Sequence, residues 1–128
     1  MEKELARYNA LELAYLGDAV YELMVREHFL KTYASGVRDL NDHAFRVVKA
    51  TSQAKAILAL KEEFTEEEWG WIKYGRNAKN SLSRNSTARE YRYATGLETL
   101  FGALYLKGET LRLQEMLLRI LEVLDEAH

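Results

Sequence analysis

The chain has 128 residues, of which 48% are hydrophobic, and it contains neither cysteine nor proline. This length and composition predict one globular domain, residues 1–128, with a real core, and exclude disulfides and thiolate zinc sites. The net charge is −2, and the apolar runs are too short to span a bilayer. The amino-terminal residues MEKELARY do not resemble a signal peptide. We therefore expect a cytoplasmic protein without membrane contact.

The sequence predicts an all-α fold, because apolar residues recur at helical spacing and no useful stretch alternates as a strand does. In chain order the expected elements are a lead-in at residues 1–8, helices at 9–33 and 38–49, a helix capped by Thr51 or Ser52, a helix from Thr65 towards Lys79, a helix at 88–108 and a last helix through 111–124. Thr65 and Glu68 have the spacing of a capping box. Gly36 is expected to take the left-handed conformation after the first long helix.

The charges are unevenly distributed. Residues 73–92 carry six basic side chains and one acid, a net charge of +5, which leaves −7 for the rest of the chain. Within this segment, residues 79–87 read KNSLSRNST, which is expected to be a long exposed loop. A local basic segment in an acidic protein indicates contact with a polyanion.

The helix at 9–33 contains an acid where none is expected. Its apolar residues lie nearly all round, which is typical of a helix in the middle of a domain. The residues within about 60° of Asp18 on a helical wheel are Leu11, Ala14, Tyr15, Tyr21, Val25 and Phe29. A charge in such a place is costly unless it is paired or binds a metal. Glu22, one turn later, adds like-charge repulsion.

Glu98 repeats the pattern in the helix at 88–108. Its neighbours on the wheel are Tyr91, Ala94, Phe101, Gly102 and Tyr105. Gly96 and Gly102 leave room for another helix to approach, so Asp18 and Glu98 meet if their stripes face each other. Two carboxylates in contact need a cation, a shared proton or an arginine. A pair of oxygen ligands suits Mg²⁺ or Mn²⁺, and a metal site beside a basic segment indicates attack on a phosphodiester.

At this point the sequence resembles the ribonuclease III family. LAYLGDAVYELMVREHFL, residues 13–30, is similar to the family's signature helix with its LGDAV motif, and ATGLETLFGALYLKG, residues 94–108, is similar to its second acidic motif. YGRNAK, residues 74–79, resembles the RGRNAK stretch of the short form, the Mini-ribonuclease III subfamily, which lacks a separate double-stranded-RNA-binding domain. The resemblance covers nearly the whole chain.

The resemblance implies a divalent-metal endoribonuclease that cuts double-stranded RNA as a homodimer, each subunit cutting one strand. The signature helix is expected to contribute to both the dimer interface and the active centre. The subfamily further implies precursor 23S ribosomal RNA as the substrate and a ribosomal protein as a helper.

The resemblance also implies roles for single residues. It gives Asp18 the role of the catalytic, metal-binding aspartate, Glu98 that of the second metal ligand, and Arg76, Asn77 and Lys79 contacts with RNA. We add Arg84 and Arg92 to the RNA-binding set from the basic segment, and Glu22 as a candidate outer carboxylate.

The sequence departs from full-length ribonuclease III at three acidic positions, which are Leu11, Ala14 and Thr95 here. The short form shares this loss, so the number of metals stays open. Two other interpretations also remain open. In the first, the chain is a catalytically silent module that binds RNA or ribosomes. In the second, it is a helical dimer with no nucleic-acid role, whose buried acids are structural and whose basic segment is solvated surface.

Overall fold

Helices make up the regular structure of the described residues, 4–78 and 87–127 of a computed structural model. They are α1 (Ala10–Tyr33), α2 (Val37–Val48), α3 (Ala50–Ala59), α4 (Glu66–Arg76), α5 (Thr87–Leu106) and α6 (Thr110–Val123), with short 3₁₀ turns at Leu5–Arg7 and Lys61–Glu63. No strand occurs in these ranges, which confirms the all-α prediction. Across the described helices, none combines the length and apolar character needed to cross a bilayer.

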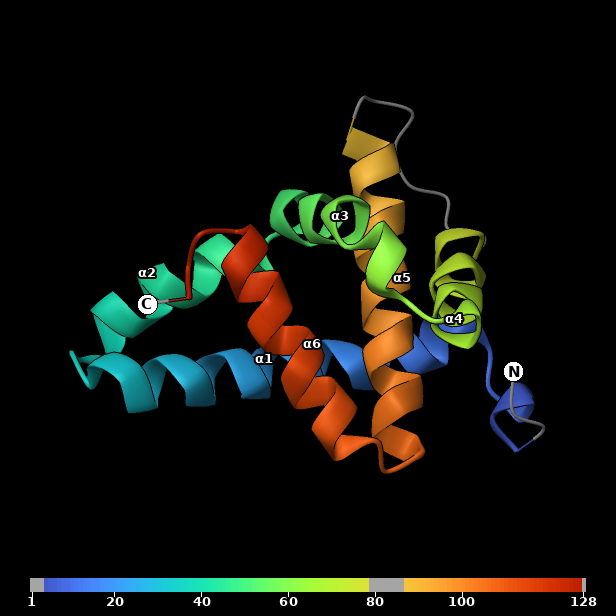
Figure 1. Ribbon diagram of the computed structural model, residues 1–128, viewed down its shortest axis with the longest axis horizontal. Coiled ribbons are helices and arrows are strands. Elements are labelled where there is room, and N and C mark those ends of the chain that lie inside the picture. Colours follow the sequence, from blue (N-terminus) through green and yellow to red (C-terminus); the bar gives the residue numbers. More distant parts are fainter. Residues whose placement is uncertain (1–3, 79–86, 128) are drawn as a thin grey trace.

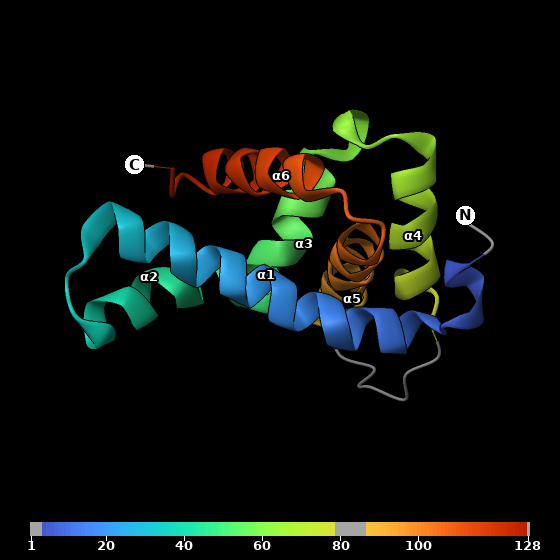
Figure 2. The same ribbon diagram turned by 90° about the horizontal axis from the view of Figure 1, so that it is seen from below.

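The arrangement is set by two long helices. α1 lies along the long axis of the molecule and α5 runs across it (Figure 1). α3 and α4 pack on α5, and α2 folds back along the carboxyl-terminal half of α1. Seen from below, α5 appears nearly end-on where α1 passes it (Figure 2). The core lies where these helices meet, around side chains such as Tyr21, Trp71 and Phe101.

The crossing of α1 and α5 is built on two glycines. A Cβ atom on Gly17 would lie 1.6 Å from the backbone oxygen of Glu98, and one on Gly102 would lie 2.1 Å from the backbone oxygen of Leu13. Atoms cannot approach so closely, so the two backbones are in direct contact only because side chains are absent there.

A second close contact joins α5 to α4. A Cβ atom on Gly75 would lie 2.3 Å from Oγ1 of Thr99, and one on Gly96 would lie 2.7 Å from the backbone oxygen of Ile72. Both glycines that were expected to admit a neighbouring helix therefore do so, but Gly96 faces α4 and Gly102 faces α1. Thr99 also donates a hydrogen bond to the backbone oxygen of Ala10, 3.2 Å away, which ties α5 to the start of α1.

Capping boxes fix where two helices begin. The predicted box of α4 is confirmed: Glu68 N donates to Thr65 Oγ1 at 3.1 Å, and Thr65 N donates to Glu68 Oε1 at 2.9 Å. α1 has the same device, with Glu12 N donating to Asn9 Oδ1 at 2.7 Å and Asn9 N donating to Glu12 Oε1 at 2.9 Å. These bonds satisfy amide groups that have no partner within the helix.

Two predicted helix ends were wrong. The left-handed residue after α1 is Ala34, with φ 47°, because the helix ends at Tyr33, three residues before Gly36. Gly36 has a positive φ of 96°, but it precedes α2 and does not cap α1. Neither Thr51 nor Ser52 caps α3, because that helix begins before both of them. The Ser52 hydroxyl instead donates to the backbone oxygen of Arg46 at 2.6 Å. The predicted loop at 79–87 lies outside the described residues, apart from the backbone of its last residue.

Replacing Gly17 with alanine should destabilise the protein by about 3 kcal/mol, because the new methyl group forces α1 and α5 apart. Gly70 provides the matched control, since it lies inside α4 and a methyl group added there would have nothing within 4 Å. Gly70→Ala should be neutral or stabilise by about 0.5–1 kcal/mol through helix propensity. Urea unfolding of both variants measures the difference, and equal stabilities would contradict the observed crossing.

Candidate active site

The crossing of α1 and α5 brings the two predicted acids together. Asp18 follows Gly17 directly, and Gly17 lies against the backbone of Glu98. The two carboxyl groups lie near enough for Asp18 to raise the pKa of Glu98, which favours the protonated form of Glu98. The expectation that the two stripes meet is therefore confirmed, and the pair consists of an exposed Asp18 and a half-buried Glu98.

The pKa of Glu98 shows that ionising this carboxyl group beside Asp18 is unfavourable. Burial, the negative charge of Asp18 and the hydrogen bond with Asp18 raise this pKa to about 8, whereas the nearby Gln53 amide lowers it. Near neutral pH Glu98 therefore holds a proton, and the pair carries about one negative charge. Among the described residues, the groups that act on this pKa are Asp18 and Gln53, and neither is a cation.

The predicted burial of Asp18 was wrong. Asp18 itself is exposed, as are its wheel neighbours Leu11, at 43%, and Tyr15, at 85%, whereas its other wheel neighbours are buried. The face in the core is centred on Gly17 and Tyr21, one to three residues away along the helix. Since consecutive helical residues are about 100° apart, Asp18 lies at the edge of the contact with α5, and the cost of burial falls on Glu98 instead.

A buried tyrosine holds this part of α1 in place. The Tyr21 hydroxyl donates to the backbone oxygen of Val47 in α2 at 3.0 Å. Its ring packs edge-on against Phe101 of α5, with 5.1 Å between centroids. Burial, together with the nearby Glu98 charge, raises the pKa of Tyr21, so its hydroxyl stays neutral and acts as a hydrogen-bond donor.

Gln53 of α3 is a site residue that the sequence analysis did not single out. It is only 2% exposed, and its amide lies beside the Glu98 carboxyl, whose pKa it lowers. Its sequence signal was weak: the Gln53-Ala54 pair fits the intervening helices of the ribonuclease III family, but this likeness gave the glutamine no role.

Glu22 does not join the acid pair in a three-acid group. Its carboxylate pairs with Arg26, one turn later, with 2.7 Å between the charged atoms. Over residues 4–78 and 87–127, no three acids, histidines or cysteines are grouped so that they could hold a metal ion. The role of Glu22 as an outer carboxylate stays a prediction.

The acidic positions of full-length ribonuclease III add no carboxylate here. Leu11 points outward, Ala14 is buried, and Thr95 uses its hydroxyl to donate to the backbone oxygen of Tyr91 at 3.0 Å. The described site therefore rests on Asp18 and Glu98.

Of the five predicted RNA-contacting residues, the structure describes Arg76, Asn77 and Arg92, while Lys79 and Arg84 lie outside the described residues. Asn77 and Arg92 are exposed, and Arg76 is half-buried at the end of α4. Arg76 Nε donates to Asn77 Oδ1 at 3.2 Å.

Tyr93 gathers two arginines from different helices. The guanidinium carbons of Arg76 and Arg89 lie 5.8 Å and 5.7 Å from the centre of its ring. Burial opposes ionisation of the Tyr93 hydroxyl, but hydrogen bonds from both arginines outweigh it and lower the pKa. Arg76 at the end of α4 and Arg89 in the first turn of α5 thus meet at Tyr93. Together with the exposed Arg92 of α5 we call these arginines the basic cluster; α5 also carries Glu98. Arg89 was counted in the basic segment but was not among the predicted RNA contacts.

These features define a helical domain with an acid pair at a helix crossing and a basic cluster on the same helix. The sequence profile of the Ribonuclease III domain matches residues 11–109. The chain belongs to the ribonuclease III family.

Similar proteins place it near the short form of that family. The chain is 45% identical to a Mini-ribonuclease 3 from Symbiobacterium thermophilum over 84% of this chain and 83% of the relative. It is 37% identical to a Mini-ribonuclease 3 from Clostridium tetani over 98% of this chain and 85% of the relative. A crystal structure of a protein from Fusobacterium nucleatum matches with a TM-score of 0.82 and 30% identity, covering 94% of this chain and 98% of that one. The predicted likeness to Mini-ribonuclease III is thereby confirmed.

The raised pKa of Glu98 predicts how stability depends on pH in metal-free buffer. Because the folded pKa is about 8 and the reference value is 4.5, the stability that Glu98 contributes is fully present below pH 4.5 and is lost as the pH rises to about 8. Glu98→Gln should remove this loss, which amounts to roughly 5 kcal/mol for a pKa raised from 4.5 to about 8, at about 1.4 kcal/mol per pKa unit.

Urea unfolding of wild type and variant between pH 5 and pH 9, with EDTA present, measures this dependence. Asp18→Asn serves as the comparison, since it should flatten the curve only in part and leave the contribution of burial. Identical pH dependence in wild type and Glu98→Gln would show that Glu98 ionises normally.

Proposed function

We propose that the protein is an endoribonuclease that cuts double-stranded RNA with a divalent cation, Mg²⁺ or in its place Mn²⁺, held by Asp18 and Glu98. The observation that supports this most is the close approach of α1 and α5 at Gly17, which brings Asp18 beside Glu98. There the pKa of Glu98 is raised to about 8, and no cation acts on it among the described residues. A hard divalent cation fits this pair of oxygen ligands and would replace the proton that Glu98 holds.

When bound, such a cation activates water for attack on phosphorus and stabilises the charge that develops on the phosphate oxygens. The protein's own residues have simpler tasks. Asp18, at the surface, presents its carboxylate to the substrate side of the site, while the half-buried Glu98 anchors the pair to α5. The close contact at Gly17 fixes the separation of the two helices from which these side chains extend.

We propose that the basic cluster binds the phosphate backbone of the duplex. Arg92 and Arg89 precede Glu98 by six and nine residues, so they lie about 9 Å and 14 Å from it along the axis of α5. Arg76 reaches the same cluster from α4 through Tyr93. Contacts with phosphates and 2′-hydroxyls recognise the shape of an A-form duplex rather than its sequence.

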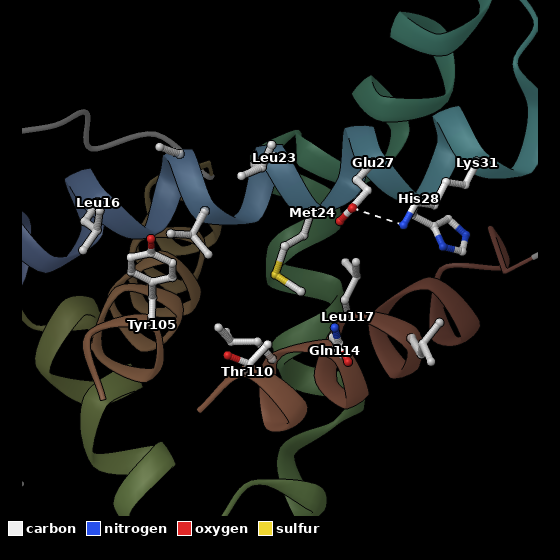
Figure 3. A pocket seen from close by; sticks show the side chains of 14 residues that line it. Leu16, Leu23, Met24, Glu27, His28, Lys31, Tyr105, Thr110, Gln114 and Leu117 are labelled. Atoms are coloured by element: carbon white, nitrogen blue, oxygen red, sulfur yellow. Dashed lines mark ion pairs between the residues drawn. The ribbon is translucent and has the colours of Figure 1, made fainter. Parts of the chain in front are cut away.

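We also propose that the protein acts as a homodimer through a groove between α1 and α6. The groove has a volume of about 600 Å³ and is lined mainly by apolar side chains (Figure 3). Leu23 is 68% exposed and Leu118 is 51% exposed, which is costly for apolar side chains that lie together. Glu27 and Lys31 form an ion pair of 3.2 Å at its edge. An apolar patch with charges of both signs beside it suits a two-fold symmetric contact.

The likeness to the short form extends the proposal to a biological role. We propose that the chain is a single catalytic domain that matures precursor 23S ribosomal RNA in the cytoplasm, with a ribosomal protein as helper.

Asp18→Asn should reduce the rate of cleavage of a perfectly paired RNA duplex in Mg²⁺ by at least about 10²–10³-fold, since it removes one of the two charged ligands. Duplex binding should stay close to that of the wild type. Asp42→Asn, an exposed acid on α2, is the matched control and should cleave normally. Normal turnover by Asp18→Asn would exclude Asp18 from the reaction, and wild-type binding without any cleavage would favour the silent RNA-binding module.

The same assay tests the substrate. A duplex made of the paired ends of precursor 23S ribosomal RNA should be cut at a fixed position, and faster when ribosomal proteins are added. Equal cleavage of unrelated duplexes under all these conditions would remove the proposed role in 23S maturation while leaving the nuclease in place.

Arg76→Ala and Arg92→Ala should each weaken duplex binding and lower the slope of log affinity against log salt by about 1, because each loses one phosphate contact. Arg119→Ala is the control: this arginine lies on α6 and pairs with Glu63 at 2.6 Å. Filter binding at several salt concentrations gives the slopes. Slopes unchanged in both arginine variants would rule out the basic cluster as the RNA contact.

Leu23→Glu should convert the dimer to a monomer, because it places a charge in the apolar groove between α1 and α6. Leu58→Glu is the control, since Leu58 is also an exposed apolar residue, at 45%, but lies on α3. Light scattering after size exclusion reports the mass of each. A dimer that survives Leu23→Glu, or a monomeric wild type, would contradict this interface.

A further inference from the structure

Tyr93 connects two arginines that belong to different helices. The guanidinium carbon of Arg76, at the end of α4, lies 5.8 Å from the centre of the Tyr93 ring, and that of Arg89, in the first turn of α5, lies 5.7 Å from it. Burial raises the pKa of the Tyr93 hydroxyl, but the two guanidinium groups lower it by more, so they act on the oxygen as well as on the ring. One aromatic side chain therefore holds two like charges near each other.

The group that these two arginines share differs from the partners of other arginines in the chain. Arg112 and Arg119 pair with carboxylates at 2.7 Å and 2.6 Å. Over residues 4–78 and 87–127, neither Arg76 nor Arg89 has a carboxylate within ion-pair distance. A carboxylate would neutralise the charge of a guanidinium group, whereas a phenol contacts it and stays neutral. Tyr93 thus leaves both positive charges available to an anion.

The position of Tyr93 in the fold suits it to this task. Its side chain is half-buried and packs against the hydrophobic core, so the core fixes the ring. Arginine side chains have many rotamers and lose entropy when a ligand orders them. Arginines that already lie against a fixed ring lose less on binding, which raises affinity. The free amide groups at the beginning of α5 add partial positive charge at the same place.

We propose that Tyr93 is a positioning residue, whose ring and hydroxyl hold Arg76 and Arg89 together as a clamp for backbone phosphates of the RNA duplex. This inference rests on the proposed binding of the duplex by the basic cluster, and it adds the side chain that orders the cluster. Guanidinium groups suit this ligand because they donate two parallel hydrogen bonds to phosphate oxygens. Tyr93 acts through the two arginines and makes no contact with the phosphate.

Tyr93→Phe tests the proposal in the full chain, because it keeps the ring and removes the hydroxyl. Filter binding should show duplex affinity reduced by roughly 5–10-fold, since the arginines must then be ordered during binding. The slope of log affinity against log salt should stay unchanged, because no cation is lost. In a chain that already carries Arg76→Ala and Arg89→Ala, Tyr93→Phe should have no further effect. An equal loss in that chain would show that the hydroxyl contacts RNA directly, and would overturn the positioning role.

Tyr74→Phe is the matched control from α4. The Tyr74 hydroxyl donates to the backbone oxygen of Tyr8 at 2.9 Å, which ties α4 to the amino-terminal segment. This variant should lower the midpoint of thermal unfolding and leave duplex affinity unchanged. If Tyr93→Phe gives the same pair of results, Tyr93 has a structural role alone and the inference is overturned.

The possible failures can be told apart. If the chain with Arg76→Ala and Arg89→Ala binds the duplex as tightly as the wild type, the proposed role of the basic cluster and the inference fail together. If that chain binds weakly while Tyr93→Phe binds like the wild type, the role of Tyr93 is overturned and the basic cluster remains the RNA contact.

Discussion

The direct contact between the backbones of α1 and α5 is the constraint on which the rest of this structure depends. Gly17 and Gly102 allow it, since a Cβ atom on either would lie within about 2 Å of the other helix. Because Asp18 follows Gly17 and Glu98 supplies the backbone that Gly17 touches, the same contact that closes the core also pairs the two acids. The site is thus a consequence of how the two longest helices pack.

The acid pair lowers the stability of the folded protein when Glu98 ionises. The pKa of Glu98 rises to about 8 because the folded protein buries it beside Asp18, and a charge held in that way weakens folding. Such an arrangement is expected where a ligand supplies the missing positive charge. Two further side chains support the pair. Tyr21 holds α1 against α2 and α5, and the Gln53 amide lowers the pKa of Glu98.

Much of this organisation follows from residue order alone. Helical spacing predicted the helices, because it reports which residues share a face. The presence of one acid on the apolar stripe of each long helix predicted that Asp18 and Glu98 lie close together. Spacing does not report which face another helix covers, so the predicted burial of Asp18 was wrong, and its wheel neighbour Tyr15 is 85% exposed. Gln53 was missed because its position depends on how α3 packs on α5. The contacts of Arg89 and Arg76 with Tyr93 likewise join residues far apart in sequence.

We expect the pair of carboxylates at the helix crossing to bind a divalent cation. The most direct measurement is anomalous X-ray scattering from crystals of this chain grown with Mn²⁺ near pH 8. An anomalous peak is expected between the Asp18 and Glu98 carboxylates, within coordination distance of both. A peak elsewhere, or a direct hydrogen bond between the two acids with no peak beside them, would contradict it.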